Sequence, residues 1–174
     1  MAQQSFQPPA PGPSPSFTAG PIVLGTEFGP VSTAAERVAI GLARQAGVPL
    51  VIVHAIDPGR LRLPGGRFRE RVDQAHSARQ RDASVLIERV RAAGVEPQLL
   101  MWDGDPATCV LDAAKAEGAS RIVVGSHGRG RLGRAIIGSV SSMIAGQADC
   151  PVDIVRGNDA TEEIVTVAPV LRRI

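Results

Sequence analysis

Residues 125–139 have the sequence GSHGRGRLGRAIIGS and lie between an expected β-strand and an expected α-helix. Glycine carries no Cβ, so a glycine-rich loop lets backbone N–H groups approach an anion closely. A helix beginning near Gly138 would direct its unpaired N–H groups and the positive end of its dipole at the same place. Ser139 would add a hydroxyl donor there. The segment therefore predicts a phosphate site at a strand-to-helix junction.

Apolar runs alternate with helical patterns along the chain. Residues 50–56 (LVIVHAI) form an uninterrupted run rich in β-branched residues, as expected of a strand covered on both faces in a parallel sheet. We therefore expect a three-layer, doubly wound α/β domain with helices on both faces of a five-stranded sheet. The expected strands are Ile22–Leu24, Leu50–Ile56, Val95–Trp102, Arg121–Gly125 and Pro151–Val155. The expected helices run from Ser32 or Thr33 to Gly47, from Arg69 to Ala93, from Pro106 to Glu117 and from Gly138 to Ala148.

Helical spacing also predicts which side chains face the core. Val38, Leu42 and the alanines between them repeat at this spacing in the first helix, where Glu36 lies in the first turn. In the second helix, Val72, Ala75, Leu86 and Val90 are expected to point inward.

The two ends of the chain differ from its centre. Residues 1–20 contain no charged residue and five prolines, which predicts a disordered tail. Residues 21–156 hold the expected domain, and residues 157–174 form a C-terminal extension. Within this extension, residues 164–167 suggest one more strand before Pro169, confined to the edge of the chain's own sheet or of a partner's sheet.

The composition of the 174 residues restricts the class of protein. The length suits one domain, and the net charge of +2 does not point to nucleic acid. Cys109 and Cys150 lie outside any metal-binding spacing and are expected to be reduced, partly buried thiols. Without an apolar run long enough to span a membrane and without a secretory signal, the expected location is the cytoplasm.

Two common glycine-loop motifs fit residues 125–139 poorly. A Walker-type loop needs a lysine beside the phosphates, but Lys115, the only lysine, belongs to the preceding helix. Gly128, Gly130 and Gly133 match the GxGxxG dinucleotide pattern. However, that pattern should directly follow its strand, which here ends at Gly125, and an acidic residue should stand at the end of the next strand. The nearest candidate, Asp153, lies inside its strand. The dinucleotide reading remains a minor alternative.

The spacing of the glycines over the whole segment resembles that of a known family. Gly125, Gly128 and the pair Gly138-Ser139 follow the pattern Gly-x2-Gly-x9-Gly-Ser. This pattern resembles the signature of ATP-binding universal stress proteins. The resemblance covers residues 21–156 and includes an acid ending the first strand, His54 closing the second, Gly104-Asp105-Pro106 opening a helix and Cys150-Pro151-Val152 beginning the last strand.

The resemblance implies a sheet order of 3-2-1-4-5 and a ligand site where the first and fourth strands end side by side. The backbone near Leu50 would receive adenine, while Gly128, Gly138, Ser139 and Val140 would hold ribose and phosphates. The complete set of implied nucleotide-binding residues is Gly25, Thr26, Glu27, Leu50, Gly125, Ser126, His127, Gly128, Arg129, Gly138, Ser139, Val140 and Ser141.

The ligand implied by the resemblance is ATP, with AMP or ADP as alternatives. Magnesium would be bound through Glu27, where the family usually has aspartate. The longer side chain moves the carboxylate by about one bond length, and magnesium requires near-ideal octahedral geometry. Glu27 is therefore the position at which this chain departs from the family pattern.

The implied function is a stress-response regulator that signals through ligand occupancy and a dimer or partner surface. The resemblance implies a homodimer along the edge of the fifth strand, which would also explain Asp153 in an apolar strand, and a regulatory protein partner that the sequence does not identify. Because no nucleophile motif is present, at most weak ATP hydrolysis is expected. The alternative function is a nucleotide-free protein interaction module of the same fold.

The remaining histidines and arginines receive structural interpretations. We expect His54 to be a hydrogen-bonded residue at a strand end and His76 to be solvated on its helix. Arg129, Arg131 and Arg134 would either neutralise phosphates or keep the loop soluble. The basic run between Arg60 and Arg71 is expected to be a solvated lid, because single-strand nucleic-acid sites add stacking aromatic residues that are lacking here.

Overall fold

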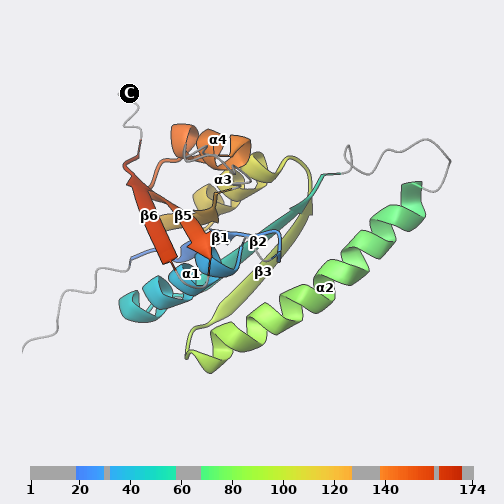
Figure 1. The fold of residues 1–174 in the computed structure, drawn as a ribbon, viewed down its shortest axis with the longest axis horizontal. Helices are drawn as coiled ribbons and strands as arrows, with labels where there is room; N and C mark the ends of the chain where they lie inside the picture. Colours follow the sequence, from blue (N-terminus) through green and yellow to red (C-terminus); the bar gives the residue numbers. More distant parts are fainter. Residues whose placement is uncertain (1–18, 30–31, 58–67, 127–137, 159–160, 170–174) are drawn as a thin grey trace, which may run out of the picture.

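The computed structural model describes residues 19–29, 32–57, 68–126, 138–158 and 161–169. Strands and helices alternate along these ranges up to a final β-hairpin (Figure 1). The strands are β1 (Ile22–Gly25), β2 (Leu50–Ile56), β3 (Pro97–Asp103), β4 (Arg121–Gly125), β5 (Val152–Asn158) and β6 (Thr161–Val167). The helices are α1 (Thr33–Ala46), α2 (Phe68–Ala92), α3 (Pro106–Ala116) and α4 (Ser139–Gln147).

The strands form one sheet in the order β3-β2-β1-β4-β5-β6. The first five are parallel to one another, which confirms the order 3-2-1-4-5. The added strand β6 runs antiparallel to β5 of its own chain, with Val152 opposite Val167 and Asn158 opposite Thr161. The C-terminal extension therefore covers the edge of its own sheet.

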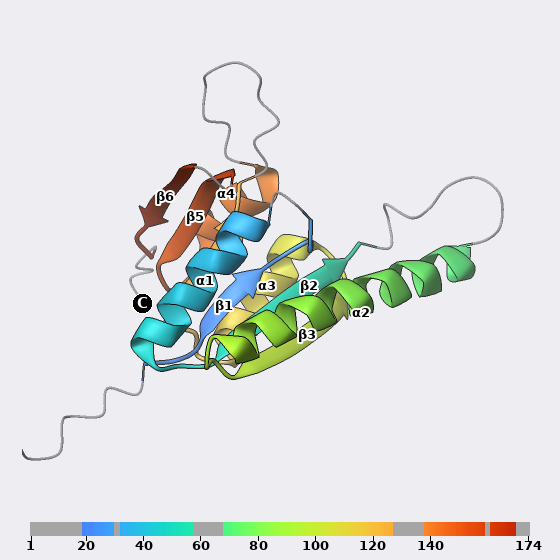
Figure 2. The same ribbon diagram turned by 60° about the horizontal axis from the view of Figure 1, so that its bottom comes forward.

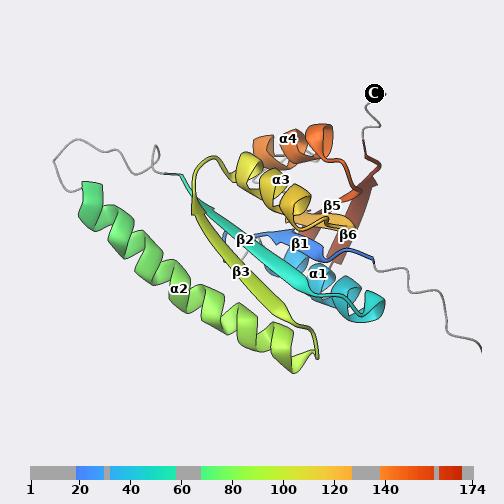
Figure 3. The same cartoon turned by 180° about the vertical axis from the view of Figure 1, so that it is seen from behind.

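Helices cover both faces of the sheet. Helices α1 and α2 lie on one face and α3 and α4 on the other, as the views from different sides show (Figures 2 and 3). Along β2 the side chains alternate between two cores: Leu50 and Ile52 pack toward α1 and α2, while Val51 and Val53 pack toward α3. This double burial explains the uninterrupted apolar run of β2. The N-terminal half of α2 projects beyond the sheet (Figure 1).

Local signals in the sequence set most of the helix ends. Gly47 ends α1 in the left-handed conformation, at φ 65°. Asp105 caps α3 by accepting a hydrogen bond from Thr108 N at 2.9 Å. Strand β3 begins two residues later than expected, because Val95 N donates instead to Val90 O and completes the end of α2. Strand β5 extends to Asn158 because it pairs with β6.

The expected inward positions were correct only in part. In α1 it is Ala35, Ala39 and Ala43 that are fully buried, whereas Val38 and Leu42 are partly buried. In α2, Leu86 and Val90 are buried as expected, and the side chains of Val72 and Ala75 lie outside the described part of the structure. The predicted disordered tail also lies outside it, except for its last two residues. Of these, Gly20 accepts a hydrogen bond at its carbonyl oxygen from Ser120 Oγ at 2.7 Å.

Asp153 contradicts the explanation that the sequence suggested for it. It lies on no exposed or partner-facing edge: the residue is 2% exposed, and Arg121 Nη1 donates to both of its carboxylate oxygens at 2.9 and 2.8 Å. Thr166 Oγ1 of β6 donates to it as well, at 2.7 Å. Because β6 occupies the outer edge of β5, a homodimer along the fifth-strand edge would require β6 to leave.

Candidate functional site

The ends of β1 and β4 form a crevice at the carboxyl edge of the sheet. Gly25 of β1 lies opposite Val124 of β4, and the chain leaves β1 toward one side of the sheet and β4 toward the other. Open α/β sheets bind ligands where the strand order reverses in this way. A cavity of about 190 Å³ lies at this point, on the α3 and α4 face.

The cavity brings together eight of the predicted site residues from three separate segments. Each segment lies at the end of a strand or the beginning of a helix. These residues are Gly25 at the end of β1, Thr26 and Glu27 just after it, Gly125 at the end of β4, and Gly138, Ser139, Val140 and Ser141 at the start of α4. Residues more than 100 positions apart in sequence thus share one cavity wall.

Leu50 does not belong to this group. It pairs with Ile22 at the beginning of β1, at the opposite edge of the sheet, where it is fully buried and its N–H donates to Glu96 O. Ser126 also lies outside the cavity wall, and its N–H donates to Val155 O at 2.9 Å. His127, Gly128 and Arg129, together with Arg131 and Arg134, lie outside the described residues, as does most of the basic run from Arg60 to Arg71.

Sequence reasoning missed the apolar wall of the cavity. From β2 the cavity takes Val53 and Ala55, near the carboxyl end of the strand. The other residues in its wall that we had not predicted are Ser32, Pro106, Val110, Val124 and Ile144. The signal for the β2 residues was available: ligands bind at carboxyl ends of parallel strands, so Ala55 was the better candidate than Leu50.

Gly25 is required by close packing at the cavity. A Cβ added there would lie 2.9 Å from Val110 Cγ2 and 3.0 Å from Val124 Cγ1. Both distances are shorter than Cβ contacts in proteins normally are, so the side chains of Val110 in α3 and Val124 in β4 would have to shift to admit a side chain. The glycine therefore allows β1 and α3 to approach each other beside the cavity.

The beginning of α4 offers hydrogen-bond donors to the cavity. Gly138 is the N-cap residue, with extended φ and ψ of −62° and 157°, and no side chain of the described residues caps the helix. The first N–H groups of a helix have no acceptor within the helix. Ser141 Oγ donates to Gly138 O at 3.0 Å, which uses this hydroxyl and leaves the exposed Ser139 hydroxyl at the cavity. This end of α4 is chemically suited to an anion.

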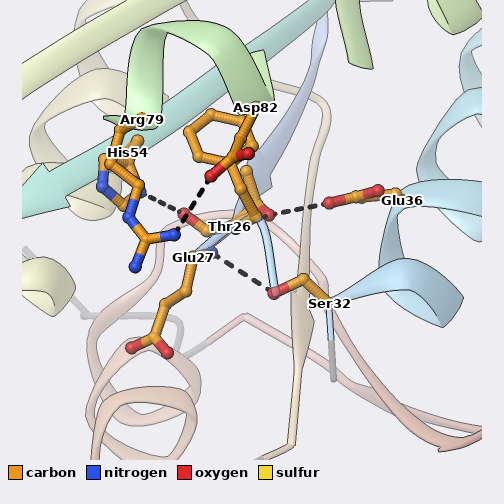
Figure 4. Close-up of polar contacts among 8 residues, drawn as sticks. Thr26, Glu27, Ser32, Glu36, His54, Arg79 and Asp82 are labelled. Carbon is orange, nitrogen blue, oxygen red and sulfur yellow. Dashed lines mark hydrogen bonds and ion pairs between the residues drawn. The ribbon is translucent and has the colours of Figure 1, made fainter. Parts of the chain in front are cut away.

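Hydrogen bonds hold the turn that follows β1 (Figure 4). Thr26 N donates to Val53 O at 3.0 Å, and Thr26 Oγ1 donates to Glu36 Oε1 at 3.0 Å. The same hydroxyl accepts a hydrogen bond from Phe28 N at 3.0 Å, and Glu27 N donates to Ser32 Oγ at 3.3 Å. The Glu27 side chain is exposed and points away from these contacts (Figure 4).

His54 of β2 contacts the turn after β1 through a hydrogen bond and a ring contact. It is 4% exposed, and its Nδ1 donates to Thr26 O at 2.7 Å, which confirms that it is a hydrogen-bonded strand histidine. The ring of Phe28 lies 4.9 Å from the His54 ring, between centroids. Burial lowers the pKa of His54 below its ordinary value, although the hydrogen bond to Thr26 opposes this effect. His54 is therefore expected to be neutral at neutral pH.

His76 is less solvated than the sequence suggested. Its Nε2 lies 3.1 Å from Asp103 Oδ1, and its side chain is one-third exposed. The contact joins α2 to the end of the edge strand β3.

Replacing His54 by glutamine is expected to reduce the loss of stability on acidification. Because the pKa of His54 is lowered in the folded protein, the unfolded chain binds the proton first as the pH falls. This contribution to stability is present above about pH 6.5 and is lost as the pH falls through that value toward the folded-state pKa. Urea unfolding at about pH 7.5 and 5.5 measures the effect; an equal loss in both proteins would assign it to other groups.

The described residues contain neither a metal cluster nor an activated thiol. No group of three or more His, Cys, Asp or Glu side chains among them could hold a metal ion. Burial raises the pKa of both Cys109 and Cys150, which are free cysteines, so neither is suited to act as a nucleophile at neutral pH. Among the same residues no helix combines the length and apolarity needed to cross a membrane.

The fold and the crevice define a doubly wound α/β protein with a cavity at the strand-order reversal. A family model described as the universal stress protein family matches residues 19–156. The chain belongs to the universal stress protein family, as the sequence pattern had indicated.

Relatives from several organisms support this assignment. A universal stress protein of Mycolicibacterium smegmatis is 34% identical over 142 residues, which are 78% of this chain and 45% of the relative. One of Thermus aquaticus is 34% identical over 123 residues, covering 70% of this chain and 88% of the relative. The chain thus spans about half the length of the mycobacterial relative.

Solved structures of the family have the same fold. A universal stress protein from Archaeoglobus fulgidus superposes with a TM-score of 0.61 at 28% identity, covering 78% of this chain and 97% of that protein. The structure of the Archaeoglobus fulgidus protein in complex with dAMP superposes with a TM-score of 0.59 at 25% identity, covering 78% and 96%.

Proposed function

We propose that this protein binds an adenine nucleotide, with ATP as the first candidate, and acts as a stress-response regulator whose signal is ligand occupancy. The observation that carries this proposal is the cavity at the ends of β1 and β4. Its wall combines Gly125, Gly138 and Ser139 of the glycine pattern with the turn after β1. The remaining glycine of the pattern, Gly128, lies outside the described residues. The Archaeoglobus fulgidus relative in complex with dAMP supports an adenine nucleotide as the ligand class.

Each part of the cavity suits a different part of a nucleotide. The aliphatic side chains of Val53, Ala55 and Val110 offer an apolar wall for the base. The N–H groups at Gly138 and Ser139 and the positive end of α4 suit the phosphates. In this proposal Ala55 replaces Leu50 as the β2 residue nearest to adenine.

Binding is proposed without efficient turnover. Glu27 is the one acidic or basic side chain among the described residues that line the cavity. Its carboxylate could share a magnesium ion with the phosphates, with the remaining ligands supplied by water. A general base positioned by a second group is not found among these residues, so ATP hydrolysis is expected to be slow.

Calorimetric titration with ATP tests the proposal. We expect saturable binding with a Kd below about 1 mM, and weaker binding of adenosine because it lacks the phosphates. Titrations with and without Mg²⁺ determine whether ATP binding depends on a metal ion. Absence of binding at millimolar ATP would reject the nucleotide proposal and favour the interaction module.

The homodimer, the protein partner and the cytoplasmic location stay predictions.

A further inference from the structure

A buried carboxylate in α1 connects three elements behind the site. Glu36 is 5% exposed and lies among the alanines that pack α1 against the sheet. Burying a carboxylate is unfavourable unless both oxygens find donors. Here Oε1 accepts from Thr26 Oγ1 at 3.0 Å, and Oε2 accepts from Arg89 Nη1 of α2 at 2.9 Å. Glu36 thus joins the end of β1 to both helices on that face.

The Thr26 hydroxyl links Glu36 to the turn after β1 by two hydrogen bonds. Since its proton is directed at Glu36, its lone pairs are available to accept from Phe28 N at 3.0 Å. Phe28 has φ 56°, a left-handed conformation that is unfavourable for a bulky residue and persists only where surrounding contacts hold it. Two contacts hold Phe28 in this conformation: the hydrogen bond from its N–H to Thr26 Oγ1 and the packing of its ring against the His54 ring.

The turn determines where Glu27 lies. Glu27 stands between Thr26 and Phe28, and Thr26 and Glu27 both line the cavity. Figure 4 shows Glu36 on the opposite side of Thr26 from the Glu27 carboxylate, so Glu36 does not itself reach the cavity. The hydrogen bond from Phe28 N to the Thr26 hydroxyl therefore closes the turn that contains Glu27.

We propose that Glu36, oriented by Arg89, is a positioning residue that holds the turn after β1 in the conformation required for ligand binding. The inference rests on the proposed function for its ligand. The positioning role accounts for a carboxylate that is buried in α1 although its ion-pair partner, the Arg89 side chain, is 40% exposed.

The central variant removes both charges. In Glu36→Met/Arg89→Met no unpaired charge stays behind, so the protein should stay folded and its urea unfolding midpoint should fall only by the loss of the acceptor for the Thr26 hydroxyl. ATP affinity should nevertheless fall at least tenfold, and the ring nitrogen resonances of His54 should shift because Thr26 O moves. Glu36→Gln keeps an oxygen that can accept from Thr26 and should restore ATP affinity to within about threefold of the wild type.

A matched control removes another ion pair of the same helix. Arg37 of α1 donates from Nε to Glu162 Oε1 of β6 at 2.8 Å. Glu162→Met deletes this pair without touching Thr26 and should leave both ATP affinity and the His54 resonances unchanged.

A second variant tests the same inference without altering the ion pair. Thr26→Val keeps the size of the side chain but removes the hydroxyl, so it should lower ATP affinity to the same extent as the double variant. Wild-type affinity in Thr26→Val, or in a folded double variant, would overturn the proposal and leave Glu36 a purely structural role.

The His54 resonances separate this inference from the proposed function. If the wild-type protein does not bind ATP, the function is rejected, but a shift of these resonances in Thr26→Val and the double variant still supports the positioning role. Unchanged resonances in both variants would overturn it.

Discussion

Gly138→Val is expected to weaken ATP binding at least tenfold, or about 1.4 kcal/mol. Gly138 lies in the cavity wall and caps α4 with extended backbone angles that valine can adopt. The substitution should therefore leave the backbone intact and act by placing two methyl groups where a phosphate would approach. Calorimetric titration of both proteins with ATP measures the change.

Gly146→Val is the matched control in the same helix. A Cβ added at Gly146 would meet nothing within 4 Å, and this glycine lies near the other end of α4. Its ATP affinity should equal that of the wild type. Equal affinities for the Gly138 variant and the control would mean that the phosphates are not bound at the start of α4, even though the fold is correct.

Asp153→Ala is expected to lower the free energy of unfolding by about 3 kcal/mol, which is the lower end of the range for breaking a buried ion pair. The variant leaves Arg121 Nη1 and Thr166 Oγ1 without their buried acceptor. Arg121 is one-third exposed, so water can partly replace the lost contact and keeps the effect at that lower end. Urea denaturation of both proteins measures the difference.

Asp149→Ala serves as the control because Asp149 is exposed just before β5. It should change the free energy of unfolding by less than about 0.5 kcal/mol. A similarly small effect for Asp153→Ala would show that Arg121 is fully solvated without its partner. The buried contact would then not hold β6 against the sheet.

The strands were predictable where burial on both faces leaves a strong pattern. β2 and β4 have the bounds expected from their apolar runs, because the central residues of both strands pack against one helix layer or the other. Boundaries shifted where hydrogen bonds from a neighbouring element decided them. Val95 completes α2 instead of beginning β3, and β5 is longer because β6 pairs with it.

Part of the candidate site was also predictable. Glycines at fixed spacing indicated the cavity residues Gly125, Gly138 and Ser139, since a close approach of backbone to ligand depends on local residue type. Leu50, which the resemblance implied as the adenine contact, does not line the cavity, because it lies at the beginning of β2. The register places Val53, and not Leu50, opposite Gly25.

The sequence by itself determined the doubly wound class, the strand-to-helix loop and the family, because periodicity and spacing are local properties of the chain. Only the tertiary structure decided the partners of the buried charges. Glu36 appeared as a favourable acid in the first turn of α1, and Asp153 as an anomaly in an apolar strand. Their partners Arg89 and Thr166 lie on other elements, 53 and 13 residues away, and no local pattern records such contacts. Packing of α1, α2 and β6 onto the sheet brings these groups together and satisfies the buried carboxylates.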